Sequence, residues 1–336
     1  MPSLENFRLT VFRAVASQLS FRKAAEELYL TQPAVTFQIK ALEEDLGVQL
    51  FDRSGQRIAL TPAGQQLLEA ARSSHAQLEA VVHQLASLDG QLAGELVLGV
   101  STTISQYLLP RLIRGFLTLH PHTRFRVLTG NTETIVQSVL DAHSALGLIE
   151  GPARSREVST EPFLRDEMVL LVPAAHEWTE EIAARDLLGV PLLLRERGSG
   201  SRHVLELALE KAGVRLKSLR VAMELDSVEA IKSAVEAGLG VGFVSRWAVA
   251  RDLRLGQQFR IVPVGDLVVT RHFSSVALAS PAPHGLALEF RRFLAAQFPP
   301  AAAHPAGTPV PSRTKRPGAH KQSRPQKAPT STNKPR

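Results

Sequence analysis

Residues 20–47 read SFRKAAEELYLTQPAVTFQIKALEEDLG and predict two short helices in close succession. Ser20 and Thr31 are residue types that cap helix N-termini, and Gly47 is the type that most readily ends a helix. Only two residues separate the first helix from the second cap. Because so short a connection forces the helices to cross steeply, the stretch predicts a helix-turn-helix.

The second of these helices has two unlike faces. At about 100° per residue, one apolar stripe is expected to be buried. Its members are Val35, Ile39, Leu42 and Leu46. The opposite face carries a proline, a threonine, a phenylalanine and a lysine in place of the usual mixture of charges. That face therefore requires a function other than core packing.

Elements on either side complete a small domain. Apolar spacing predicts a first helix over residues 3–17, and two β-prone runs around Ser54-Gly55 predict a hairpin, or wing. Residues 1–61 are thus expected to form a winged helix-turn-helix domain, all-α apart from its wing. Such a domain is either a DNA-binding unit or an ordinary three-helix packing unit with a solvated third helix.

The exposed face of the second helix suits a major groove, where its side chains would hydrogen-bond base edges or touch thymine methyl groups. The candidates for these contacts are Gln32, Pro33, Thr36, Phe37 and Lys40. Basic residues nearby would grip the flanking phosphates. These are Arg22, Lys23, Arg53 and Arg57. Local packing is the alternative role for Phe37.

Residues 14–64 resemble the winged helix-turn-helix of LysR-type transcriptional regulators nearly position for position. The stretch that carries the resemblance is AVASQLSFRKAAEELYLTQPAVTFQIKALEEDLGVQLFDRSGQRIALTPAG. The resemblance implies contacts with double-stranded promoter DNA by Ser20, Thr31, Gln32, Pro33, Thr36, Lys40 and Arg53. Thr36 stands where the family more often has serine, which preserves the hydroxyl. Phe37 stands at a variable position and is a candidate determinant of operator preference.

A long helix is expected next, from the Thr61-Pro62 cap to about Leu88. Its seam alternates spacings of four and three, with one polar interruption. The seam residues are Leu67, Ala71, Ser74, Leu78, Val81, Leu85 and Leu88. So narrow a seam suits pairing with a second copy, and packing on the chain's own body is the alternative. The family resemblance implies that residues 62–90 are a dimerisation helix and that the protein is a homodimer or homotetramer.

After this helix, apolar strands alternate with helices, which predicts α/β sheets with crossover helices. We expect two lobes with a ligand cleft between them. Lobe I is expected over residues 91–163 and 265–298, and lobe II over residues 164–264. The expected crossing strands are EPFLRDE and RIVPVGD.

Two strand ends expected to face the cleft carry anion-binding chemistry. Ser101-Thr102-Thr103 follows the first strand, and residues 195–202, RERGSGSR, follow a strand of lobe II. Hydroxyls, glycine amides and an arginine at a helix start would together form a receptor for carboxylate, phosphate or sulfur oxyanions. Simple N-capping of the helices that follow is the alternative.

Residues 91–298 also resemble the LysR-type effector domain, which has the periplasmic-binding-protein shape. The motifs GNTETI, LIEG, RERGSGSR and LDSVEAIKSAVEAGLGVGFVS resemble the subgroup that controls carbon-fixation operons or sulfite and cysteine metabolism. The resemblance implies that a small, anionic metabolite binds at Ser101, Thr102, Thr103, Asn131, Glu150, Gly198, Ser199, Gly200, Ser201 and Arg202. Ala145 replaces an aspartate common in relatives, so the identity of the effector does not transfer.

Other classes of protein fit the sequence less well. An oxidoreductase reading of GLGVGF fails because the G-x-G-x-x-G spacing requires glycine at Phe243, and there is no G-x-S-x-G, P-loop lysine or H-E-x-x-H. Cysteine is absent. We therefore predict a multidomain regulator that is not an enzyme and has no catalytic residue, metal site or cofactor. A secreted solute receptor would share the lobes but would need an export signal and would have no use for residues 1–62.

The N-terminus shows no export signal, and no apolar run in the sequence is long enough to span a bilayer, so we expect a cytoplasmic protein without a membrane partner. RNA polymerase is a further candidate partner.

The net charge of +7 arises from residues 299–336, which contain nine Pro, eight Lys or Arg and no acid. This tail is expected to be disordered. It either adds salt-sensitive DNA affinity or is inert.

Overall fold

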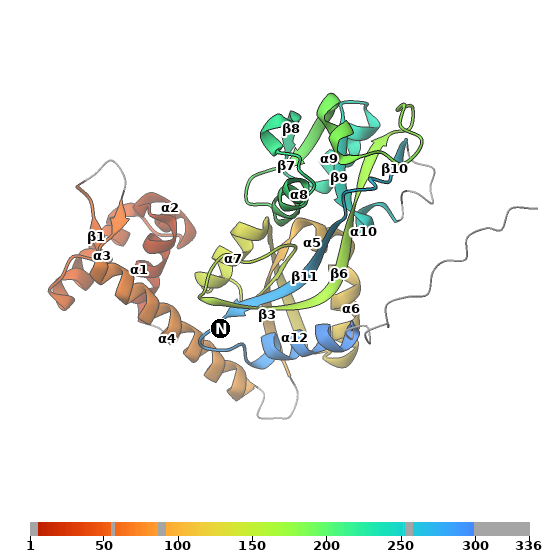
Figure 1. Cartoon of the computed structure of the whole chain (residues 1–336). Coiled ribbons are helices and arrows are strands. Elements are labelled where there is room, and N and C mark those ends of the chain that lie inside the picture. The colour runs from red at the N-terminus through yellow and green to blue at the C-terminus, as the bar shows by residue number, and fades with distance from the viewer. Residues whose placement is uncertain (1–5, 55–57, 87–91, 251, 253–257, 299–336) are drawn as a thin grey trace, which may run out of the picture. The chain divides into compact units, whose positions relative to one another are not determined.

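The computed structural model describes residues 6–54, 58–86, 92–250, 252 and 258–298. Figure 1 shows the helices and strands of these ranges, coloured along the chain. The predictions for Arg57, for Leu88 and for the tail lie outside the described residues.

The N-terminal domain consists of three helices and a short hairpin. The helices are α1 (Phe7–Gln18), α2 (Phe21–Glu27) and α3 (Gln32–Leu46), and the antiparallel strands are β1 (Phe51–Asp52) and β2 (Ala59–Leu60). The caps form as the sequence predicts. The Ser20 side chain accepts from the Lys23 amide, and the Thr31 side chain accepts from the Ala34 amide. Gly47 ends α3 with a left-handed φ of 69°.

The apolar stripe of α3 is buried over most of its length. Val35, Ile39 and Leu42 join the core that α1, α2 and the hairpin complete. The prediction for Leu46 is wrong, because this side chain is 48% exposed. Leu46 stands on the last turn of α3, and that turn extends past the buried cluster.

The long helix α4 (Pro62–Ala86) begins where the sequence predicts, and Thr61 Oγ1 accepts from the Gly64 amide at 3.0 Å. Its predicted seam divides into two parts. Ala71 is buried and Leu67 packs against the N-terminal core, so the first turns pack on their own chain. Further along, Val81 is 46% exposed. The exposed part is the portion free to meet a second copy.

One mixed sheet spans the α/β region, with strand order β4-β3-β5-β11-β6-β9-β7-β8 and with β10 paired to β6. The lobe I strands β3 (Gly94–Ser101), β4 (Thr123–Gly130) and β5 (Leu146–Ile149) are parallel to one another. The lobe II strands β7 (Pro191–Arg195), β8 (Arg220–Leu225) and β9 (Val241–Ser245) are likewise parallel.

Helices flank both sets of strands. In lobe I they are α5 (Thr102–Tyr107), α6 (Leu109–Leu119), α7 (Thr132–Leu140) and α12 (Gly285–Gln297). In lobe II they are α8 (Gly200–Lys211), α9 (Val228–Glu236), α10 (Arg246–Val249) and the 3-10 turns η1 (Ala184–Gly189) and η2 (Leu216–Ser218). The alternation of strand and helix is therefore the one that the sequence predicts.

Two long antiparallel strands, β6 (Val158–Pro173) and β11 (Val269–Leu278), connect the lobes and run side by side in Figure 1. The segment EPFLRDE lies in β6, as predicted. The prediction for RIVPVGD is wrong, since its strand β10 (Phe259–Val262) pairs only with the lobe II end of β6. Separate apolar clusters fill lobe I and lobe II. The crossing strands thus hold together two lobes that each have their own apolar core, with Trp247 and Tyr107 packing across from one lobe onto the core of the other.

Candidate DNA interface and effector site

The face of α3 opposite its core stripe is open to solvent. Its exposed residues are Gln32, Pro33, Phe37 and Lys40. Phe37 is 67% exposed, so local packing does not account for this side chain. Thr36 Oγ1 donates to the Gln32 carbonyl oxygen at 2.9 Å, and Lys40 Nζ lies 3.7 Å from a carboxylate one turn later. An exposed ion pair of this kind contributes little stability, which leaves the lysine available to another partner.

The two capping residues have a structural role in the free protein. Ser20 Oγ accepts from the Lys23 amide at 3.3 Å, and Thr31 Oγ1 accepts from the Ala34 amide at 3.4 Å. The cap at Thr31 fixes the start of α3, which is the part of a recognition helix that meets base edges.

Basic side chains flank this face. The Arg53 guanidinium lies 4.7 Å from the centre of the Phe21 ring and 3.4 Å from Glu43, at the base of the wing. Arg22 is exposed and lies 3.2 Å from Glu26. Both cations are held by weak contacts at the surface, where phosphate can compete for them.

In the α/β region, Glu150 is the centre of a buried hydrogen-bond network at the end of β5. Its Oε1 accepts from the Thr103 amide at 2.9 Å. Its Oε2 accepts from Ser201 Oγ at 2.7 Å and from Arg271 Nη1 at 2.9 Å. One carboxylate therefore joins α5 of lobe I, the start of α8 in lobe II and the crossing strand β11.

Arg271 is shared between two buried carboxylates. Its Nε donates to Asp166 Oδ2 at 2.7 Å, and Ser245 Oγ donates to Asp166 Oδ1 at 2.8 Å. Burial raises the pKa of Asp166, and Arg271 offsets this only in part. Burial would also raise the pKa of Glu150, but the charges of Arg271 and Arg195 outweigh it and lower that pKa to about 2. Glu150 is thus ionised at neutral pH.

Arg195 forms a second connection between the lobes. It ends β7, and its Nη2 donates to Thr102 Oγ1 and to the Asp226 carbonyl oxygen, each at 3.1 Å. Its Nε lies 2.8 Å from Glu196 Oε2. The side chain is buried, so its charge acts in a region with little water.

Five buried polar atoms around this network have no hydrogen-bond partner among the described residues. They are Ser101 Oγ, Thr103 Oγ1, Thr132 Oγ1, Arg195 Nη1 and Arg271 Nη2. Buried polar groups are nearly always paired, because leaving one unpaired costs about 1–3 kcal/mol. The two arginine nitrogens can only donate and the three hydroxyls can donate as well as accept, so an acceptor such as an oxyanion could pair with any of the five.

The capping alternative explains some of the predicted effector residues. Asn131 Oδ1 accepts from the Thr134 amide at 3.0 Å, and Ser199 Oγ accepts from the Arg202 amide at 3.5 Å. Ser101 stands at the cap position of α5, yet its side chain makes no capping hydrogen bond. Capping therefore accounts for Asn131 and Ser199 and does not account for Ser101.

The structure divides the ten predicted effector residues into two groups. The interior network or its immediate neighbours include Ser101, Thr102, Thr103, Glu150 and Ser201. A cavity outside the network is lined by Gly198, Ser199, Gly200 and Arg202. The tenth residue, Asn131, donates through Nδ2 to the Arg197 carbonyl oxygen at 3.3 Å and so joins the lobes beside this cavity.

Sequence reasoning missed Arg271, Asp166 and Thr132 as site residues. It included Arg195 in the anion-binding segment 195–202 but not among the effector residues. One signal was present for Arg271. Arg271 lies between Val269 and Phe273 at a spacing of two along β11, so the three side chains share one face of the strand, and all three are buried. A charged residue at an inward strand position is rarely buried without a partner, so this alternation alone marks Arg271 for attention.

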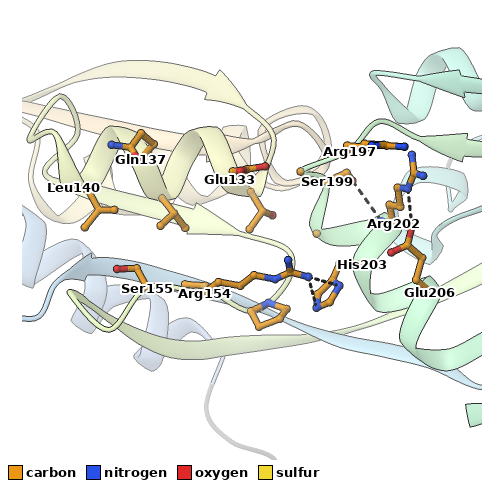
Figure 2. Close-up of a pocket in the computed structure, with 16 residues that line it drawn as sticks. Glu133, Gln137, Leu140, Arg154, Ser155, Arg197, Ser199, Arg202, His203 and Glu206 are labelled. Atoms are coloured by element: carbon orange, nitrogen blue, oxygen red, sulfur yellow. Dashed lines mark hydrogen bonds and ion pairs between the residues drawn. The ribbon is translucent and has the colours of Figure 1, made fainter. Parts of the chain in front are cut away.

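Figure 2 shows the cavity, which has a volume of about 600 Å³. It lies beside α7, the loop after β5 and the start of α8. In Figure 2 the side chains of Arg154 and His203 point toward one another, as do those of Arg202 and Glu206. Residues of both lobes thus line it.

Comparison with known proteins decides the family. Residues 89–299 match the LysR substrate binding domain, and residues 7–65 match the bacterial regulatory helix-turn-helix protein, lysR family. The chain belongs to the LysR family. It is a DNA-binding transcriptional regulator with an effector-binding domain, and it is not an enzyme, which agrees with the expectation from its motifs.

Individual relatives agree with this assignment. The probable RuBisCO transcriptional regulator of Cyanophora paradoxa is 39% identical over 259 residues, which cover 76% of this chain and 79% of the relative. Full-length OxyR from Pseudomonas aeruginosa has a TM-score of 0.64 at 25% identity, over 88% of this chain and 96% of that chain. The Synechocystis CcmR regulatory domain in complex with 2-PG has a TM-score of 0.56 at 24% identity, over 61% of this chain and 98% of that chain.

These matches confirm the predicted LysR-type architecture, a helix-turn-helix domain followed by a two-lobed α/β domain. None of the helices in the described ranges combines the length and apolar character that crossing a membrane requires.

Proposed function

We propose that this LysR-family protein regulates a carbon-fixation operon and that a small anion bound between its lobes sets its activity. The operon class is supported by likeness to the probable RuBisCO transcriptional regulator of Cyanophora paradoxa. The ligand is supported by the five buried donors without a partner among the described residues. Two of them belong to arginines, which bind carboxylate and phosphate through paired hydrogen bonds.

The same anion would control the arrangement of the lobes. Arg195 reaches Thr102 from lobe II, and Ser201 reaches Glu150 from lobe II. A ligand held by Arg195, Arg271 and Ser101 would touch lobe II, a crossing strand and lobe I together. Binding would shift the equilibrium between two arrangements of the lobes, and the size of the shift is set by the difference in the ligand's affinity for the two.

In this proposal the exposed face of α3 recognises the DNA bases, and the wing and α2 bind the flanking phosphates. The contact residues are the predicted ones: Ser20, Arg22, Thr31, Gln32, Pro33, Thr36, Phe37, Lys40, Arg53 and Arg57. The support is the solvent exposure of that face, above all of Phe37. An apolar side chain held in water at the centre of a recognition helix gains by burial against a thymine methyl group.

Assembly and output complete the proposal. We infer that α4 pairs two copies, as a homodimer or within a homotetramer, and that two copies of α3 read a quasi-palindromic operator. Promoter DNA as partner supports a cytoplasmic location. RNA polymerase is the proposed recipient of the signal, because a protein bound beside a promoter acts on transcription by recruiting or excluding it.

The ligand is tested by binding measurements on the full-length protein. The panel is 2-PG, sulfite, O-acetylserine, NADPH, phosphoenolpyruvate and ribulose bisphosphate, each titrated by calorimetry and then added to footprints of the protein's own upstream DNA. Thr103→Val keeps the side-chain shape but removes a buried donor, so it should weaken binding about three- to tenfold. Thr118→Val is the matched control, because Thr118 is exposed on α6.

If the Thr103→Val variant binds every ligand as tightly as the wild type does, the effector site lies elsewhere. A footprint that no anion alters would reject anion control while leaving DNA recognition intact.

A further inference from the structure

We propose that Glu43 is a positioning residue for DNA binding, which fixes the wing against α3 and directs Arg53 toward the phosphates. This inference rests on the proposed DNA contact of Arg53. Glu43 lies on the last turn of α3 and is half-buried, and Arg53 follows β1 at the base of the wing. Because an acid beside a DNA-binding surface repels phosphate, a role inside the protein is needed to explain it.

The wing depends on contacts with the rest of the domain. Its strands β1 and β2 contain two residues each, and among the described residues its ladder consists of the pairs Phe51–Leu60 and Asp52–Ala59. A hairpin this short is at best marginally stable by itself. Packing of Phe51 in the N-terminal core holds β1 in place, yet apolar contacts are not directional. A directional contact is therefore needed to orient the strand.

Glu43 supplies directional contacts at the start of β1. Its Oε1 accepts from the Leu50 amide at 2.8 Å and from the Phe51 amide at 3.3 Å. A hydrogen bond to a charged acceptor is about twice as strong as one between neutral groups. Because the two amides belong to consecutive residues, one carboxylate oxygen fixes how the backbone enters the wing.

The other oxygen of Glu43 acts on Arg53. Arg53 Nη2 lies 3.4 Å from Oε2, and the guanidinium carbon lies 4.7 Å from the centre of the Phe21 ring. That ring is fixed in turn, because it meets the Phe51 ring edge to face at a centroid distance of 5.7 Å. The Arg53 side chain therefore has a defined direction, although 43% of it is exposed.

Arg53 keeps donors for DNA in this arrangement. A guanidinium has five N–H donors, and Nη2 is the one side-chain nitrogen of Arg53 with a hydrogen-bond partner among the described residues. The remaining donors can bind phosphate oxygens. Because Glu43 and Phe21 orient the side chain before DNA arrives, less rotamer entropy is lost on binding. Glu43 thus favours binding through Arg53, although its own charge opposes binding.

DNA titrations of full-length variants test this role, with fluorescence anisotropy as the readout over a range of salt concentrations. The probes are the protein's own upstream DNA and a scrambled duplex of the same length, since phosphate contacts act on both. Glu43→Ala should weaken binding to both about fivefold and lower the slope of log K against log salt by about 0.9, as Arg53→Ala does. Once Glu43 is replaced, Arg53→Ala should cost little more.

Glu44→Ala is the matched control. It removes the same charge from the same helix, but Glu44 is exposed and lies 3.7 Å from Lys40. Its loss should leave binding unchanged or strengthen it, because an acid is removed and Lys40 is freed. Glu43→Gln keeps an oxygen for the two amides, so it should retain affinity within about threefold of the wild type. Thermal unfolding of each variant sets an assay temperature at which all are folded.

Three results would overturn the inference about Glu43. One is a Glu43→Ala variant that binds as tightly as Glu44→Ala. Another is weaker binding of Glu43→Ala with an unaltered salt slope, because the loss would then reflect damage to the fold and not the Arg53 contact. The third is a Glu43→Gln variant as weak as Glu43→Ala, because the amide contacts would then not be what positions the wing.

Failure of the proposed DNA contact gives a different result. If Arg53→Ala itself binds like the wild type, Arg53 does not touch DNA, and the role of Glu43 fails with that contact. If Arg53→Ala weakens binding and Glu43→Ala does not, the DNA contact stands and only the inference about Glu43 fails.

Discussion

Arg271 Nη1 lies 2.9 Å from Glu150 Oε2, and this pair fastens the crossing strand β11 to the end of β5. Both side chains are almost completely buried. Because the same guanidinium also holds Asp166 on β6, one positive charge fixes the position of both crossing strands beside the cleft. A change at this pair is therefore felt in both lobes.

Replacing Arg271 by alanine should destabilise the protein by about 3–5 kcal/mol, since it leaves two buried carboxylates without their cation. Urea unfolding of the full-length protein measures this. Arg246→Ala is the control, because Arg246 lies 2.9 Å from Glu167 in an exposed pair and should cost at most about 1 kcal/mol. Similar losses in the two variants would show that burial of the Arg271 network contributes nothing extra.

A prediction about alkaline pH follows from Tyr107 of lobe I. Its hydroxyl donates to Glu229 of lobe II, and Lys232 Nζ lies 5.5 Å from its ring centre. Burial raises the pKa of Tyr107, and the charges of Glu229 and Asp252 raise it further. Since the folded pKa exceeds the unfolded one, its stabilisation is complete below about pH 10 and is lost progressively above it.

Unfolding free energies measured between neutral and alkaline pH test this prediction. The wild type should lose stability above about pH 10 more steeply than Tyr107→Phe, which has no proton to lose there. In a Tyr29→Phe background Tyr107 is the only tyrosine. Its absorbance change should then come at a pH above the ordinary tyrosine range, and an ordinary titration would contradict the buried contact.

DNA recognition separates into base contacts and phosphate contacts. Phe37→Ala should cost about 1 kcal/mol or more on the preferred operator and relax preference for thymine at one position, with an unchanged salt slope. Arg22→Ala should weaken binding to all sequences alike and reduce the slope of log K against log salt by about 0.9. Electrophoretic shifts over a range of salt concentrations measure both. If Phe37→Ala instead reduced the salt slope and Arg22→Ala instead relaxed the sequence preference, Phe37 would not be the base contact and Arg22 would not be the phosphate contact.

The local features of the N-terminal domain could be predicted because they depend on neighbours in sequence. The caps at Ser20 and Thr31 need a hydroxyl and an amide three residues away, and the stripe through Val35, Ile39 and Leu42 needs only helical periodicity. Leu46 fits the same periodicity but is exposed, because burial depends on what lies opposite, and the N-terminal core does not extend that far.

The interior network could not be predicted in the same way. Arg271 is 121 residues from Glu150 and 105 from Asp166, so no spacing rule connects them. The sequence places hydroxyls after β3 and at the start of α8, yet the choice of partner for each depends on how two lobes meet. Arg202 illustrates this, since it was expected to bind an anion, and in the structure it lines a cavity between the lobes and also pairs with Glu206 and Glu224.

The proposed pairing of α4 predicts the behaviour of Val81, which is 46% exposed on the predicted seam. If a second copy covers this side chain, Val81→Glu would bury a charge at a seam position and weaken self-association about tenfold or more. Sedimentation equilibrium measures the change. Gln77→Glu is the control, because it adds the same charge at an exposed position outside the seam and should leave the mass unaltered. A Val81→Glu protein that associates as tightly as the wild type would place the pairing surface on another part of the chain.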